Sequence, residues 1–364
     1  MASLAPFFVS RYNLFSVVFW LYYSPVMLSS LFQLLGNIRV MSNSSGLAFA
    51  HLLDGQGGSS ELNETDLPAW QADHGVLWLH FDYTHPDAER WLLEQSGLDS
   101  VIANALLEDE TRPRTTSINN GLLMSLRGIN HNQHAHCDDM ISIRVWIDPH
   151  IIVTTRREMS SSAAELDKLL NQGIGPKDSA EFLIKLIDLT VDGMSDTIAG
   201  FEDMIADYED AVLAGNTENL HDNIAQLRRQ VISMHRYLAP ERDALARLTL
   251  EKISWLSDYD RIQIHEISDT LIRYIENLDA VRERAVLVQE ELHSKTAEQL
   301  NARMYVLSVI AAVFLPLSFV TGLLGINVGG IPGANDSHAF TDVIIMLTVV
   351  ALILLILFRW KKWF

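Results

Sequence analysis

The stretch that decides the fold is MYVLSVIAAVFLPLSFVTGLLGINVGGIPG, residues 304–333. Its first 21 residues, Met304 to Leu324, carry no charged side chain. About 20 apolar residues are enough to cross the roughly 30 Å of a bilayer's hydrocarbon core. Asn327 follows, within a run of glycines and a proline. The stretch therefore predicts a transmembrane helix over residues 304–327, with an uncharged amide at its end.

A second apolar stretch, residues 343–358, is just long enough to span when its flanks are included. The tail, residues 359–364, reads RWKKWF, which combines basic and tryptophan anchors. The loop between the spans, residues 328–342, has no Lys or Arg. By the positive-inside rule we expect this loop to be external and both ends of the hairpin to be cytoplasmic.

The chain carries 46 acidic against 27 basic residues, a net charge of −19, and the acidic excess falls between residues 41 and 300. Such a region repels nucleic acid phosphates and gathers cations. A single cysteine, Cys137, excludes an internal disulfide and a Cys-rich zinc module. The sequence contains no phosphate-binding glycine loop, nucleophile elbow or HExxH motif, so we do not expect an enzyme.

Residues 41–160 predict a cytoplasmic α/β domain with a largely antiparallel sheet, after a turn-rich lead-in over 41–64. Alternating or continuous apolar runs predict strands, and one amphipathic run predicts a helix. The expected strands are 75–83, 121–130, 140–148 and 151–157, and the expected helix is 86–96. Residues 1–40 are apolar but contain Pro25 and lack a basic cluster. We interpret them as an upstream extension that precedes a start at Met41, with an extra hydrophobic segment as the alternative.

From Ser161 onward the sequence predicts helices only. Residues 161–256 form cytoplasmic helices with breaks at 171–179, 214–217 and 252–257, and residues 257–303 form a long stalk helix. Because no Pro or Gly occurs between Asp258 and Leu315, the stalk continues into the first span. Apolar residues recur along it in steps of three and four, which indicates packing on neighbouring helices. They are Ile264, Ile267, Leu271, Tyr274, Leu278, Val281, Ala285, Val288 and Leu292.

The opposite face of this helix carries two rows at heptad spacing. One row runs back from Ser318 through Ala311, Met304 and Ala297 to Glu290, Glu283 and Glu276. Its partner row comprises Leu315, Ser308, Asn301 and Ser294. If several copies gather around an axis, the glutamates form rings, which favour cations over anions. The alternative is an ordinary solvated helix face.

The segment HNQHAHCDD, residues 131–139, offers zinc ligands in His131, His134, His136 and Cys137. It lies between two predicted strands, so the alternative is a polar loop at a hairpin tip. Asn327 likewise has an ordinary explanation, as an amide in the turn after a helix that Gly325 closes.

The triplet Gly325-Ile326-Asn327 at the end of the first span, followed by a short second span and a basic tail, resembles the CorA-type metal ion transporters. Common magnesium-transporting members have methionine in the middle of the triplet. Here isoleucine and the following VGGIPG resemble the zinc-transporting branch, as do EDETRPR, MISIRVWID, WLSDYDR and the stretch RRQVISMHRYLAPERDALARL. The resemblance covers about residues 46–364.

The resemblance implies an α+β cytoplasmic domain, a long helical stalk and two C-terminal transmembrane helices, assembled as a funnel-shaped homopentamer in the cell inner membrane. It implies that the triplet forms the pore entrance and selects the ion, with Asn327 holding a hydrated cation. The implied pore lining comprises Asn301, Met304, Leu307, Leu315 and Ser318. Four of these five lie on the heptad face, which favours that face as the pore.

We therefore expect a zinc transporter that needs no cofactor. Uptake is the favoured direction, and both efflux and proton coupling are left open. The alternatives are a magnesium, cobalt or nickel channel of the same architecture and, from another class, a membrane-tethered coiled-coil scaffold.

Overall fold

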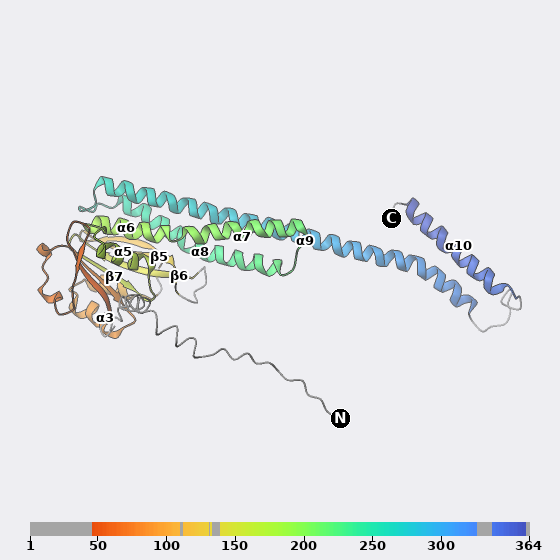
Figure 1. Ribbon diagram of the computed structural model, residues 1–364, viewed down its shortest axis with the longest axis horizontal. Coiled ribbons are helices and arrows are strands. Elements are labelled where there is room, and N and C mark those ends of the chain that lie inside the picture. The colour runs from red at the N-terminus through yellow and green to blue at the C-terminus, as the bar shows by residue number, and fades with distance from the viewer. Residues whose placement is uncertain (1–45, 110–111, 131, 133–138, 326–336, 362–364) are drawn as a thin grey trace, which may run out of the picture. The chain divides into compact units, whose positions relative to one another are not determined.

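The computed structural model describes residues 46–109, 112–130, 132, 139–325 and 337–361 (Figure 1). The predicted extension, residues 1–40, lies outside this part of the chain. The chain divides into two compact units. The first contains the sheet, the helices up to Gly193 and residues Pro240–Ser268, and the second contains Met194–Ala239 and the chain from Asp269 onward.

The first unit is built on a seven-stranded sheet of order β2-β1-β3-β7-β6-β5-β4. Its strands are β1 (Leu47–Leu53), β2 (Ser59–Glu61), β3 (Leu77–Asp82), β4 (Arg114–Ile118), β5 (Gly121–Ile129), β6 (Met140–Ile147) and β7 (Ile151–Arg156). Strands β3 and β7 pair in parallel, and the other described pairs are antiparallel. The prediction of a largely antiparallel sheet is confirmed, and all four predicted strands are present.

Two parts of the sheet contradict the sequence prediction. The lead-in over residues 41–64 contains β1 and β2. The prediction missed these strands because it averaged the apolar run LAFAHLL with its Gly- and Ser-rich surroundings. Strand β4 was missed because it is a polar edge strand. It joins β5 through Asn119 and Asn120, which both adopt positive φ, as two-residue hairpin turns require.

Helices cover both faces of this sheet. On one face α3 (Pro86–Arg90), a π-helical turn (Trp91–Gln95) and α4 (Ser100–Leu107) close a core of aliphatic and aromatic side chains. On the other lie α5 (Ser161–Asn171) and α6 (Ser179–Asp192), beside the sheet in Figure 1. Phe182 of α6 meets Trp78 edge to face at 4.8 Å between ring centroids. Short 3₁₀ turns occupy Leu67–Ala69 and Ala72–His74.

The remaining helices are α7 (Ser195–Ala214), α8 (Leu220–Leu250), α9 (Asp258–Leu324) and α10 (Ala339–Trp360). The predicted breaks near 171–179, 214–217 and 252–257 are all present, and a further break at Gly193 and Met194 was missed. Helix α9 is continuous over 67 residues, which is on the order of 100 Å. The predicted union of stalk and first span in one helix is thus confirmed.

Glu241 of α8 is a buried carboxyl in the first unit. Its side chain is 0% exposed and accepts a hydrogen bond from the Arg127 backbone N–H at 3.2 Å. Burial raises its pKa from 4.5 to about 8, because desolvation disfavours the charged form. Its Oε2 has no hydrogen-bond partner in the described part of the chain. Glu241 is therefore protonated in the native state at neutral pH.

This proton makes stability depend on pH. Between pH 4.5 and about 8 the native state keeps a proton that the unfolded state releases, so stability falls as pH rises, by about 1.4 kcal/mol per pH unit for one proton. We expect Glu241→Gln to raise the thermal midpoint of the detergent-solubilised protein at pH 8 and to change it little at pH 4.5. Glu94→Gln, at an exposed position, is the matched control. Parallel pH profiles for wild type and Glu241→Gln would contradict the assignment.

Candidate ion pathway

Helix α9 has two different faces along its stalk. The predicted packing stripe is buried at Ile264, Leu271, Leu278, Val281, Ala285, Val288 and Leu292, and its other members, Ile267 and Tyr274, are half-buried. The glutamates of the opposite row, Glu276, Glu283 and Glu290, are all exposed. The interpretation of the stripe as a packing face is confirmed. Exposure in one chain fits both a solvated face and a face that other copies surround.

Polar contacts fix the rotation of α9 within the second unit, where Figure 1 shows α7, α8 and α9 alongside one another. Arg284 donates two hydrogen bonds to the Glu209 carboxylate of α7, at 2.8 and 2.7 Å. This bidentate pair lowers the pKa of Glu209. Lys295 donates to the Val212 carbonyl at 2.6 Å. The sequence pattern did not single out these residues, because it does not show which helix lies beside α9.

The exposed face also carries a leucine that the sequence analysis left out. Leu287 is 64% exposed and stands one heptad before Ser294, so it extends the partner row toward the N-terminus of α9. Single exposed leucines are common on protein surfaces. Here, however, the row continues to Leu315, which is 76% exposed. Extending the heptad count backward from Ser294 would have found it.

The C-terminal part of α9 bears the remaining predicted lining residues that the structure describes. Asn301, Met304, Leu307, Leu315 and Ser318 are all exposed in the single chain. In the described part of the chain, α9 and α10 are the two helices that are long and apolar enough to cross a membrane, and their most apolar windows are not buried. Large unpaired apolar surfaces of this kind mark contact with lipid or with other protein chains.

Pro316 lies inside this stretch of α9 without ending the helix. Transmembrane helices tolerate such prolines where neighbouring groups satisfy the freed backbone. Beyond it, the N–H of Gly325 donates to the Thr321 carbonyl at 2.9 Å and so closes the helix. Ile326 and Asn327 lie outside the described residues, and their roles stay predictions.

The predicted zinc ligands His131, His134, His136 and Cys137 also lie outside the described residues. The strands that flank them are paired, with Ile129 opposite Met140, so the segment joins two antiparallel strands as expected. Within the described ranges, no group of three or more His, Cys, Asp or Glu side chains is placed to hold a metal.

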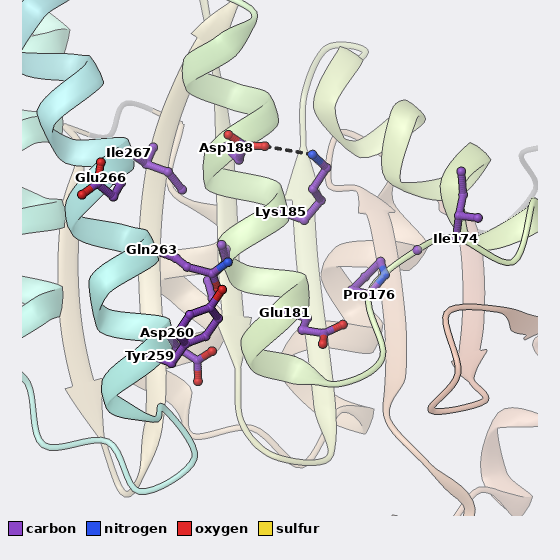
Figure 2. A pocket seen from close by; sticks show the side chains of 12 residues that line it. Ile174, Pro176, Glu181, Lys185, Asp188, Tyr259, Asp260, Gln263, Glu266 and Ile267 are labelled. Atoms are coloured by element: carbon purple, nitrogen blue, oxygen red, sulfur yellow. Dashed lines mark hydrogen bonds and ion pairs between the residues drawn. The ribbon is translucent and has the colours of Figure 1, made fainter.

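A cavity of about 560 Å³ opens in the first unit between α6 and the start of α9 (Figure 2). Its wall carries Glu181, Asp260 and Glu266, and Figure 2 shows Lys185 directed at Asp188, with which it pairs at 2.8 Å. The described carboxylates do not converge as a metal site would require. We assign this cavity no role in the pathway.

The long helix α9 thus combines a patterned exposed face with an apolar C-terminal part, and a second apolar helix, α10, follows it. A family model described as CorA-like Mg²⁺ transporter protein matches residues 73–362. The chain belongs to the CorA family. This CorA-family membership confirms the resemblance seen in the sequence. Because the family consists of ion transporters, it also confirms that the protein is not an enzyme.

Individual relatives agree with this assignment. The Zinc transport protein ZntB of Yersinia enterocolitica is 36% identical over 319 residues, which cover 88% of this chain and 96% of that protein. The Divalent cation transporter CmaX of Pseudomonas aeruginosa is 35% identical and is covered over 97% of its length, with 87% of this chain. A solved structure of full-length CmaX has a TM-score of 0.74, at 35% identity, and covers 88% of this chain and 98% of its own. The CorA fold predicted from the sequence is thus confirmed for the chain.

Proposed function

We propose that this CorA-family chain is a divalent cation transporter of the cell inner membrane that favours zinc, and that it works as a homopentamer around α9. The observation that carries the proposal is the exposed face of α9, which runs from Glu276 to Ser318 in one unbroken helix. Similarity to ZntB supports zinc as the transported ion. The family's magnesium-transporting description and CmaX support the alternative, a magnesium, cobalt or nickel channel of the same build.

The proposed path begins at the triplet Gly325-Ile326-Asn327. Five Asn327 amides around an axis would offer dipoles without net charge, which suits a cation that keeps its hydration shell. A hydrated ion can then leave again, because no carboxylate binds it tightly at the entrance. The amide ring accounts for an uncharged residue at the mouth of a transporter with an acidic interior.

Below the entrance, Leu315, Leu307 and Met304 would form apolar constrictions that close by excluding water. Asn301 and Ser318 would supply weakly polar positions between the constrictions and the two ends of the pore. A membrane potential that is negative inside drives uptake, by about 2.3 kcal/mol per charge and 100 mV, or roughly 4.6 kcal/mol for a divalent ion. Proton coupling stays open, because residues 304–324 and 343–358 contain no Asp, Glu or His to relay protons.

The proposed orientation places both ends of the hairpin in the cytoplasm. Arg359 lies in the last turn of α10, and Lys361 and Lys362 follow the helix in the sequence. Such basic clusters stay on the cytoplasmic side. The loop 328–342 would then face outward, and the acidic first part of the chain inward.

The glutamate row gives a prediction that distinguishes a pore face from a solvated face. Changing Glu276, Glu283 and Glu290 together to Gln should reduce cation flux several-fold at low ionic strength and less at high salt, where the field is screened. The measurement is zinc flux into vesicles at two salt concentrations. A matched triple change at other exposed acidic positions, Glu94, Asp99 and Glu181, controls for net charge. Equal fluxes for the two triple variants would show that the three glutamates of α9 belong to an ordinary solvated helix face.

The function itself can be tested in bacterial cells that lack their own zinc importers. Expression of the chain should raise cellular zinc, measured by elemental mass spectrometry, several-fold above cells that express the Asn327→Ala variant. Cellular magnesium should stay unchanged. A rise in magnesium without a rise in zinc would favour the alternative channel.

A further inference from the structure

Two histidines face each other between α8 and α9 in the second unit, and neither is among the residues placed in the ion pathway above. The rings of His221 and His293 lie with centroids 5.6 Å apart and planes inclined at 66°. Both side chains are exposed. In the part of the chain that the structure describes, neither makes a hydrogen bond or an ion pair. The pair therefore does not satisfy a polar group of the fold.

The position of His221 on α8 makes this pairing unusual. His221, Arg228 and His235 stand at intervals of seven residues, so they lie on one face of α8. Arg228 donates to the Gln289 side chain of α9 at 2.6 Å. His235 approaches the Asp279 carboxylate at 3.6 Å. At two of three positions a side chain of α8 thus lies against a polar acceptor on α9, whereas His221 meets a second imidazole.

The separation of the two rings is similar to that of two imidazoles bound to one metal ion. Zinc binds imidazole nitrogen at 2.0–2.1 Å and prefers a tetrahedral arrangement. Two imidazoles on one tetrahedral zinc ion have ring centroids about 5 Å apart, close to the 5.6 Å found here. The surroundings also favour a cation, because Asp222 adjoins His221 and Glu290 stands one helical turn before His293.

Lys295, the basic residue nearest to His293 in the sequence, is engaged with other groups. Lys295 is held by the Val212 carbonyl at 2.6 Å and approaches Glu291 at 3.7 Å. Its ammonium group is therefore engaged with α7 and with its own helix.

We propose that His221 and His293 together bind one zinc ion, which joins α8 to α9. Imidazole is a good ligand for zinc and a poor one for magnesium, so the site distinguishes these ions. With two protein ligands and water completing the shell, the ion exchanges readily and its occupancy follows the surrounding zinc concentration. The site does not depend on the proposed pathway, because binding requires neither transport nor a pore.

The test is zinc titration of the full-length protein in detergent by calorimetry. All proteins carry His131→Gln, His134→Gln, His136→Gln and Cys137→Ser, so that the loop cannot contribute. We expect His221→Gln and His293→Gln each to weaken the binding of one zinc ion per chain at least tenfold. His150→Gln, at another exposed histidine, should bind zinc as the parent does, and magnesium should not compete.

Zinc K-edge absorption identifies the ligands directly. The parent protein should show outer-shell scattering from two imidazoles, and each variant should lose that signal. Because both side chains are exposed, circular dichroism spectra of the variants should match the parent. Unchanged affinity in either variant, or a spectrum without imidazole scattering, would overturn the proposal. If the protein binds zinc at His221 and His293 but moves no zinc across vesicles, the proposed pathway fails and this binding site stands.

Discussion

Replacing Asn327 by alanine should reduce zinc flux by at least tenfold while the oligomer stays intact. The reason is that five amides at the entrance would replace part of the outer hydration of the arriving ion, and methyl groups cannot. The measurement is zinc uptake into vesicles that contain the purified variant, with the oligomer size checked by native mass spectrometry.

The control for this variant is Asn335→Ala, which removes an amide elsewhere in the predicted external loop. It should transport as the parent does. If Asn327→Ala transports normally, the triplet has no entrance role, and the ordinary explanation of Asn327 as part of a helix-closing turn would stand.

The second large effect is expected at the apolar constriction. Leu315→Ser would place a ring of hydroxyl groups where the proposal has a ring of isobutyl groups, so water would fill the constriction and ions would leak through it. We expect passive flux of zinc and other small cations to rise at least tenfold. Fluorescent indicators inside vesicles, read without an applied potential, measure this leak.

Leu317→Ser is the matched control, because the helical spacing places Leu317, two residues further on, on the opposite side of α9 at nearly the same depth. Its leak should equal that of the parent protein. A tight Leu315→Ser protein, or an equal leak in both variants, would remove Leu315 from the proposed pore.

The sequence predicted those parts of the fold whose patterns are long and regular. Helix α9 was predictable because its stripe repeats over nine positions without a Pro or Gly, and burial of Leu278 and Val288 confirms the face. Short elements were not. Strand β1 was hidden by the glycines that follow it, and β4 has too few apolar residues to signal a strand.

The candidate site was predictable only in part. Heptad spacing selects the face that carries Glu283 and Met304, but a single chain cannot show what that face meets. The contact between Arg284 and Glu209, which fixes the helix rotation, depends on tertiary packing that periodicity does not encode. The pairing of His221 with His293 likewise joins residues 72 positions apart in sequence, so spacing gave no signal for it.

The most direct test of the central claim is the flux of zinc against that of magnesium in vesicles that contain only the purified protein. Both ions are supplied at equal concentration under the same inward-negative potential, with and without a pH gradient. We expect zinc to enter at least tenfold faster than magnesium, and the effect of the pH gradient will show whether protons are coupled. Magnesium entry without zinc entry, or no flux of either ion, would contradict the account.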